Sequence, residues 1–129
     1  MLTYIPNYVI YLLSGVFLLG VFFVVYTRTT PLDEVALVRA GNAAAALSLS
    51  GALIGFTLTI ASGILHNSAL LGFVAWSAGA MVVQLSAYAV FARLLPGAKE
   101  QIEAGNIAMG GLLGAISLSA GVINAACLS

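Results

Sequence analysis

No charged residue occurs between Arg39 and Arg93. A soluble domain carries roughly 25% charged residues, whereas 6% of this chain is charged and 62% is hydrophobic. Because a soluble fold must cover its outside with polar groups, an uncharged stretch of this length does not fit one. It is long enough for two membrane-crossing helices, each of which needs about 20 apolar residues. The sequence therefore predicts that a lipid bilayer surrounds most of the chain.

Four apolar segments predict an all-α membrane protein with a single membrane domain over residues 1–129. The transmembrane helices are expected at about 8–26, 43–65, 70–92 and 107–128. At about 1.5 Å per residue, segments of this length cross a hydrocarbon core of about 30 Å. The second segment is weakly hydrophobic, because its Leu, Ile and Phe residues contribute roughly −3 to −5 kcal/mol and its Ser, Thr and Gly residues offset part of that. The fourth segment is weakly hydrophobic as well, and we expect both to need protein neighbours.

The basic residues predict the orientation in the membrane. Arg28 and Arg39 belong to the first loop, and Arg93 and Lys99 belong to the third. Since Lys and Arg accumulate on the cytosolic side, both charged loops are expected in the cytosol and both chain termini outside. No basic residue precedes the first apolar segment, so we interpret it as a retained span rather than a cleaved signal.

The chain resembles two copies of one hairpin unit, residues 1–65 and 66–129. One constant offset aligns VRAGNAAAALSLSG with IEAGNIAMGGLLGA, and a proline lies upstream each time. Each unit has a long apolar span, a short helix that begins with proline, and a small-residue span. The short helices, Pro31–Ala40 and Pro96–Ala104, are expected at the membrane surface in the cytosolic loops. Both units start outside, so the repeat is parallel.

Four amide side chains form the candidate polar site inside or at the edge of the membrane: Asn42, Gln84, Asn106 and Asn124. Each has two interpretations. Asn42 and Asn106 follow Gly41 and Gly105, so they fit helix caps, or they meet as a polar site at the cytosolic mouth. The amides of the third and fourth spans fit interhelical hydrogen bonds or the lining of a polar cavity.

Small residues at three- and four-residue steps predict contact between the second and fourth spans. Such spacing places them on one helix face and lets two backbones approach closely. The glycines expected at this contact are Gly51, Gly55, Gly110, Gly114 and Gly121.

Several classes of function are not expected. The spans hold no ionisable acid, base or His, so no catalytic residue is predicted. His66 is the only His and Cys127 the only Cys, so neither a metal site nor a cofactor is expected. The net charge is zero, which excludes a nucleic-acid footprint. The loop acids, Glu34 among them, are expected in solvent, and Tyr26 is expected in an interfacial aromatic belt.

Three stretches of sequence carry a family resemblance. They are NAAAALSLSGALIG, the Val-Val-Gln-Leu around Gln84, and GNIAMGGLLGAISLSAGVINAAC. With them the chain resembles the YjfL family of small bacterial inner-membrane proteins, domain of unknown function 350. The resemblance implies a four-span protein of the bacterial inner membrane without an assigned activity. It also implies a gene neighbourhood of membrane-stress proteins and ATP-grasp enzymes, and so a role in envelope maintenance.

Two functions are compatible with these features. The first is a non-enzymatic component of an envelope-stress or membrane-maintenance system, which forms homo-oligomers and binds a cytosolic partner through loops 27–41 and 93–105. The alternative is a passive channel, transporter or lipid-translocating protein, in which two or more copies enclose a groove lined by the four amide side chains.

Overall fold

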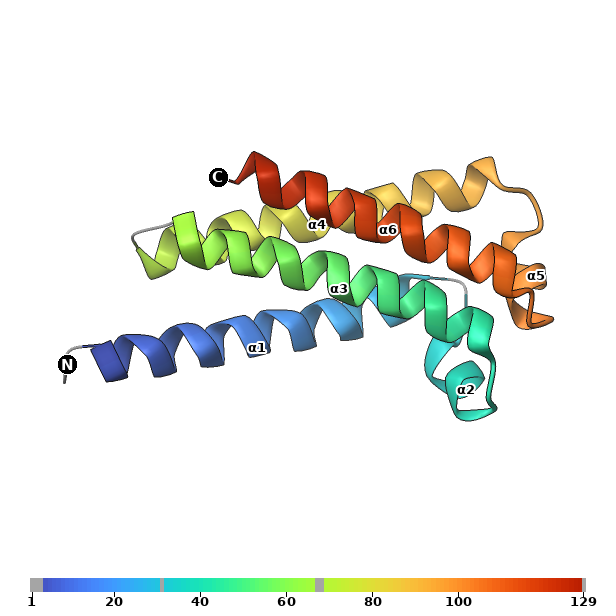
Figure 1. The fold of residues 1–129 in the computed structure, drawn as a ribbon, viewed down its shortest axis with the longest axis horizontal. Coiled ribbons are helices and arrows are strands. Elements are labelled where there is room, and N and C mark those ends of the chain that lie inside the picture. The colour runs from blue at the N-terminus through green and yellow to red at the C-terminus, as the bar shows by residue number, and fades with distance from the viewer. Residues whose placement is uncertain (1–3, 31, 67–68, 129) are drawn as a thin grey trace.

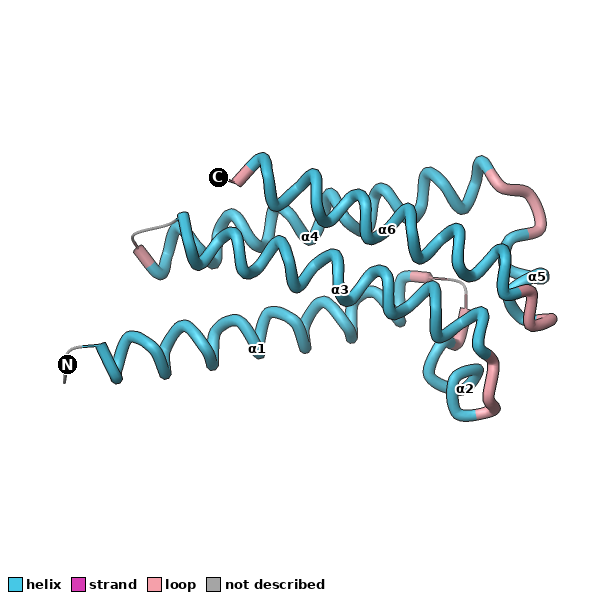
Figure 2. The backbone as a smooth tube through the Cα atoms, in the orientation of Figure 1, coloured by secondary structure: helices cyan, strands magenta, loops and turns pink. Residues whose placement is uncertain are grey.

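The computed structural model describes residues 4–30, 32–66 and 69–128, and the regular elements of these ranges are all helices (Figures 1 and 2). They are α1 (Tyr4–Thr29), α2 (Glu34–Arg39), α3 (Ala43–His66), α4 (Leu70–Leu94), α5 (Ala98–Glu103) and α6 (Ile107–Cys127). The helices α1, α3, α4 and α6 are long and apolar enough to cross a membrane. The predicted all-α, four-span fold is therefore confirmed.

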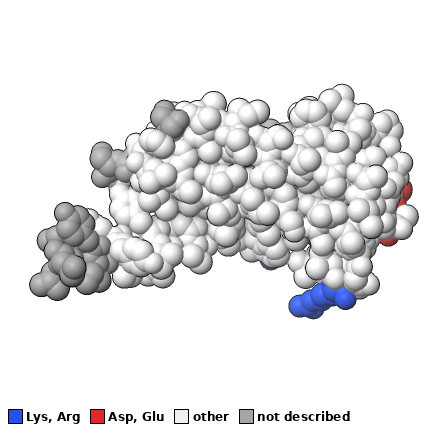
Figure 3. Space-filling view, viewed as in Figure 1, with Lys and Arg blue, Asp and Glu red and all other residues white. Residues whose placement is uncertain are grey.

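The four long helices lie along one direction, and both short helices lie at the same end of the bundle (Figure 1). The start of α1 and the end of α6 lie toward the opposite end (Figure 1). On the face shown in Figure 3, the charged side chains lie toward the end that carries α2 and α5, and the rest of that face is uncharged. The bundle thus has one charged end, and a long surface that suits lipid.

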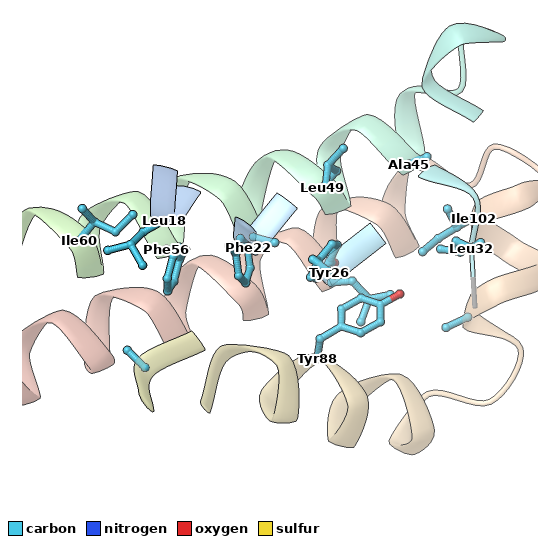
Figure 4. Packing of buried hydrophobic residues seen from close by; sticks show 14 of the residues in the cluster. Leu18, Phe22, Tyr26, Leu32, Ala45, Leu49, Phe56, Ile60, Tyr88 and Ile102 are labelled. Carbon is cyan, nitrogen blue, oxygen red and sulfur yellow. The ribbon is translucent and has the colours of Figure 1, made fainter. Parts of the chain in front are cut away.

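The central helix of the bundle is α3. Buried residues make up 56% of its most apolar stretch, against 17% for α1 and 28% for α4 and α6. This explains how a weakly hydrophobic segment can lie in a membrane, because all of its glycines and several of its polar residues, Ser48, Thr59 and Ser62, face other helices rather than lipid. Towards the middle of the bundle, Phe22 of α1 stacks on Phe56 of α3 with ring centroids 4.4 Å apart (Figure 4).

The contact between α3 and α6 is a backbone contact. A Cβ atom at Gly51 would lie 2.0 Å from the carbonyl oxygen of Gly114, and one at Gly110 would lie 2.1 Å from that of Ala44. A Cβ atom at Gly121 would lie 2.3 Å from the backbone of Gly55. The small-residue faces that the sequence indicates therefore meet each other in the bundle.

Hydroxyl groups add two hydrogen bonds to the same contact. Thr59 Oγ1 donates to the carbonyl oxygen of Gly121 at 3.0 Å, and Ser62 Oγ donates to that of Ala125 at 2.6 Å. Bonds of this kind are typical of helices that pack in lipid.

Two predictions about the charged end need correction. Tyr26 is not at an interface: it is completely buried, and its ring packs edge-on against Tyr88 with centroids 5.2 Å apart. The short helices do not begin at the prolines, because α2 begins at Glu34 after the N-cap Asp33, and α5 begins at Ala98. Pro31 lies outside the described residues, as do residues 67–68, between the second and third predicted spans, and residue 129. The surface location of these helices stays a prediction.

Candidate functional site

Asn42 and Asn106 occupy corresponding helix starts. Asn42 Oδ1 accepts from the backbone N–H of Ala45 at 3.0 Å, and Asn106 Oδ1 accepts from that of Met109 at 3.3 Å. The glycine before each has φ of +86°, the left-handed conformation that ends a helix. The capping interpretation is therefore confirmed. The predicted repeat requires such matching turns, but it stays a prediction.

Three of the four predicted amides also join helices. Asn42 Nδ2 donates to the carbonyl oxygen of Ile102 at 2.7 Å, which ties the start of α3 to α5. Gln84 Nε2 donates to the carbonyl oxygen of Ser117 at 2.8 Å, and Asn124 Nδ2 donates to that of Ala80 at 3.0 Å. Both of these bonds join α4 to α6.

Within the described residues, none of the four amides is hydrogen-bonded to another. Asn106 is exposed, and its side chain caps its own helix. The single chain therefore does not gather the four residues into one site. A groove enclosed by several copies stays a prediction.

A different set of polar side chains does converge. We call it the buried polar cluster, and each member is at most 5% exposed. Its members come from five helices: Tyr26 from α1, Glu34 from α2, Ser48 from α3, Gln84 and Tyr88 from α4, and Ser117 from α6.

Tyr26 lies beside four other members of the buried polar cluster, and Gln84 joins it through its hydrogen bond to the backbone of Ser117. The Tyr26 hydroxyl lies beside the Ser48 and Ser117 side chains, and the Glu34 carboxyl is near enough to act on it electrostatically. The same carboxyl acts on the Tyr88 hydroxyl. Figure 4 shows the Tyr88 hydroxyl directed toward the end of the bundle where Leu32 and Ile102 lie. The cluster thus runs from the charged end into the membrane-spanning part.

Four oxygens of the buried polar cluster form no hydrogen bond of standard geometry within the described residues, although the serine hydroxyls lie near that of Tyr26: the Tyr26 hydroxyl, Glu34 Oε2, Gln84 Oε1 and Ser117 Oγ. A buried polar group without a partner costs about 1–3 kcal/mol. Hydroxyl, amide and carboxyl oxygens are also the groups that hold buried water or a hard cation. This makes the cluster the strongest candidate for a functional site.

For Glu34, the prediction from the sequence was wrong. It was expected in solvent, but it is 1% exposed, and the Thr30 hydroxyl donates to its Oε1. Burial raises the pKa of its carboxyl above the ordinary value of 4.5, and the bond from Thr30 opposes part of that effect. No pattern in the sequence distinguishes Glu34 from Asp33, which is exposed and caps α2.

The raised pKa of Glu34 predicts how stability depends on pH. Because the folded-state pKa lies above the unfolded one, the stabilisation is fully present below about pH 4.5 and is lost as pH rises through the folded-state pKa. We expect the melting temperature of the purified protein to fall as pH rises from about 4.5 through the folded-state pKa of Glu34.

Glu34→Gln imitates the neutral acid, so the melting temperature of this variant should depend less on pH and should exceed that of wild type at pH 8. Glu103→Gln, at an exposed carboxyl of the same end, is the control. An unchanged slope in Glu34→Gln would contradict the assignment.

The described residues hold no group of three or more His, Cys, Asp or Glu side chains that could bind a metal ion. Cys127 is a free, exposed thiol near the end of α6.

Comparison with known proteins gives one family and two relatives. The family model described as Domain of Unknown Function (DUF350) matches residues 1–128. The UPF0719 inner membrane protein YjfL of Escherichia coli strain K12 is 32% identical over 119 residues, which cover 92% of this chain and 90% of that protein. The protein of the same name from Escherichia coli O157:H7 matches to the same extent. No solved structure matches the chain.

Proposed function

This chain belongs to the DUF350 family, and we propose that it is a non-enzymatic, self-associating component of a bacterial envelope-maintenance system. Its similarity to an inner membrane protein and its four candidate spans make it a multi-pass protein of the inner membrane. The envelope role rests on the family resemblance. Self-association rests on one observation in the structure, a second small-residue face on α6.

The second face of α6 consists of Gly111, Ala115 and Ser119, at four-residue steps. Ala115 and Ser119 are exposed, and a Cβ atom at Gly111 would meet nothing within 4 Å. The other face of the same helix is already in contact with α3. Helices associate in lipid through small residues at this spacing, because their backbones then pack closely. A second copy of the chain fits this unoccupied face.

The charged loops, 27–41 and 93–105, are the proposed contact with a cytosolic partner. Positively and negatively charged side chains are exposed in these loops, among them Arg39, Lys99 and Glu100. The proposed orientation, with this end in the cytosol, follows from the distribution of basic residues.

Gly111→Ile tests self-association through α6. The larger side chain would hold two helices apart, so we expect the dimer population in membranes to fall about tenfold or more. Cross-linking or single-molecule fluorescence in lipid bilayers measures it. Gly20→Ile on α1 is the matched control, because Gly20 is exposed, has open space within 4 Å and is flanked by Val16 and Val24 at four-residue distance. Equal loss in both variants, or in neither, would exclude the α6 interface.

The alternative function, a passive conduit, is favoured by the unpaired oxygens of the buried polar cluster. In this alternative, the buried polar cluster would line the path through the protein, in place of the four amide side chains. Gln84→Leu should then reduce solute or ion flux into vesicles that contain the purified protein. Vesicles in which wild type causes no flux would remove this alternative.

A further inference from the structure

A pocket of about 340 Å³ opens at the charged end of the bundle. Its size lies within the range of about 300–1,000 Å³ that small-molecule sites occupy. The ends of α1 and α4 and the beginning of α5 enclose it, through Thr29, Thr30, Leu85, Tyr88, Ala89, Ala92, Arg93, Ala98 and Lys99.

The lining of this pocket changes from apolar to cationic along α4. Leu85, Ala89 and Ala92 form an apolar wall over the last turns of the span, and Arg93 and Lys99 follow at the charged end. These are two of the four basic residues of the chain, and no acid is among the lining residues. A ligand complementary to this pocket is therefore anionic at one end and apolar at the other.

The threonines of the pocket are not its main hydrogen-bond donors. The Thr29 hydroxyl donates to the carbonyl oxygen of Val25, and the Thr30 hydroxyl donates to Glu34. The Tyr88 hydroxyl and the charged groups of Arg93 and Lys99 are left as donors, and a guanidinium and an ammonium both bind phosphate oxygens well. These donors suit a phosphate group.

We propose that the pocket binds an anionic phospholipid from the leaflet at the charged end. Its phosphate lies against Arg93 and Lys99, and the start of its acyl chains covers the wall formed by Leu85 and the two alanines. A free phosphate ion would leave that wall uncovered. A zwitterionic lipid carries its own cation, which competes with the two basic side chains. The proposal depends on insertion in a bilayer, and not on self-association through α6.

Native mass spectrometry of the purified protein tests this with three probes: phosphatidylglycerol, phosphatidylcholine and inorganic phosphate. We expect wild type to retain phosphatidylglycerol preferentially. At about fivefold per basic residue, Arg93→Gln with Lys99→Gln should weaken its binding about 25-fold. Arg28→Gln with Arg39→Gln removes the same charge outside the pocket lining and should retain most of the binding.

Three results would overturn the proposal: equal binding of both lipids, equal loss in the two double variants, or competition by inorganic phosphate alone. Ala92→Leu adds a larger side chain at the apolar wall, which occupies part of the pocket and leaves every charge in place. This variant keeps the proposal testable if the double variant Arg93→Gln with Lys99→Gln does not fold. It should lose phosphatidylglycerol while its helix content is unchanged. Wild-type lipid binding in this folded variant would also contradict the proposal.

Discussion

Gly51→Ala is expected to disrupt the bundle, although it adds a single methyl group. The new Cβ atom would lie 2.0 Å from the carbonyl oxygen of Gly114 and 2.4 Å from its carbonyl carbon. Backbone atoms have no rotamer that makes room, so α3 and α6 must separate along their contact. Overpacking costs about 1–3 kcal/mol, and occasionally more. We expect a loss at or above the upper end of that range, measured by thermal or denaturant unfolding in detergent micelles.

Gly79→Ala is the matched control for Gly51→Ala. Gly79 also lies in the interior of a spanning helix, but a Cβ atom there would meet nothing within 4 Å. Since alanine favours a helix over glycine by up to about 1 kcal/mol, this variant should equal or exceed wild type in stability. If both variants unfold like wild type, the close contact between α3 and α6 does not exist.

Ile54→Lys is expected to prevent correct insertion of α3. Ile54 lies near the middle of Ala43–His66 and is 53% exposed on the long surface of the bundle, so its side chain would face lipid. A lysine at the centre of a span costs about 3 kcal/mol, which is comparable to the whole insertion free energy of this weak helix. Most of the protein should then become extractable from membranes at alkaline pH, or be degraded.

The same substitution at the end of α3 should be tolerated. Leu65 is 78% exposed and lies one residue before the last of α3, where a lysine side chain reaches the interface. Leu65→Lys should therefore stay membrane-integrated. If the central and terminal lysines have equal effects, lipid does not surround the middle of α3.

The spans and the small-residue contact were predictable from the sequence, because both depend on patterns local to one segment. Lipid requires about 20 consecutive apolar residues, so the limits of α3, α4 and α6 agree with prediction within two residues. The spacing of Gly110, Gly114 and Gly121 likewise places them on one face without any knowledge of the partner helix. The Asn caps follow from the same local reasoning.

The buried polar cluster was not predictable, because it depends on how α2 packs against α3 beside Thr30, which follows α1. That position buries Glu34, while Tyr26 packs against Tyr88 of α4, and neither residue differs in type from an ordinary loop acid or interfacial aromatic. Amides were the obvious polar candidates, but only Gln84 belongs to the cluster. The long-range bond from Asn42 to Ile102 also depends on the relative placement of two segments 60 residues apart.

The central claim is that four helices cross the bilayer and leave all basic side chains on the cytosolic side. Labelling of single cysteines in intact cells with a membrane-impermeant maleimide tests it most directly. We predict that native Cys127, which is exposed at the end of α6, reacts without disruption of the inner membrane. A cysteine at Ala40 in a Cys127→Ser background, at the exposed end of α2, should react only after that membrane is permeabilised. Labelling of both positions from the same side would contradict the claim.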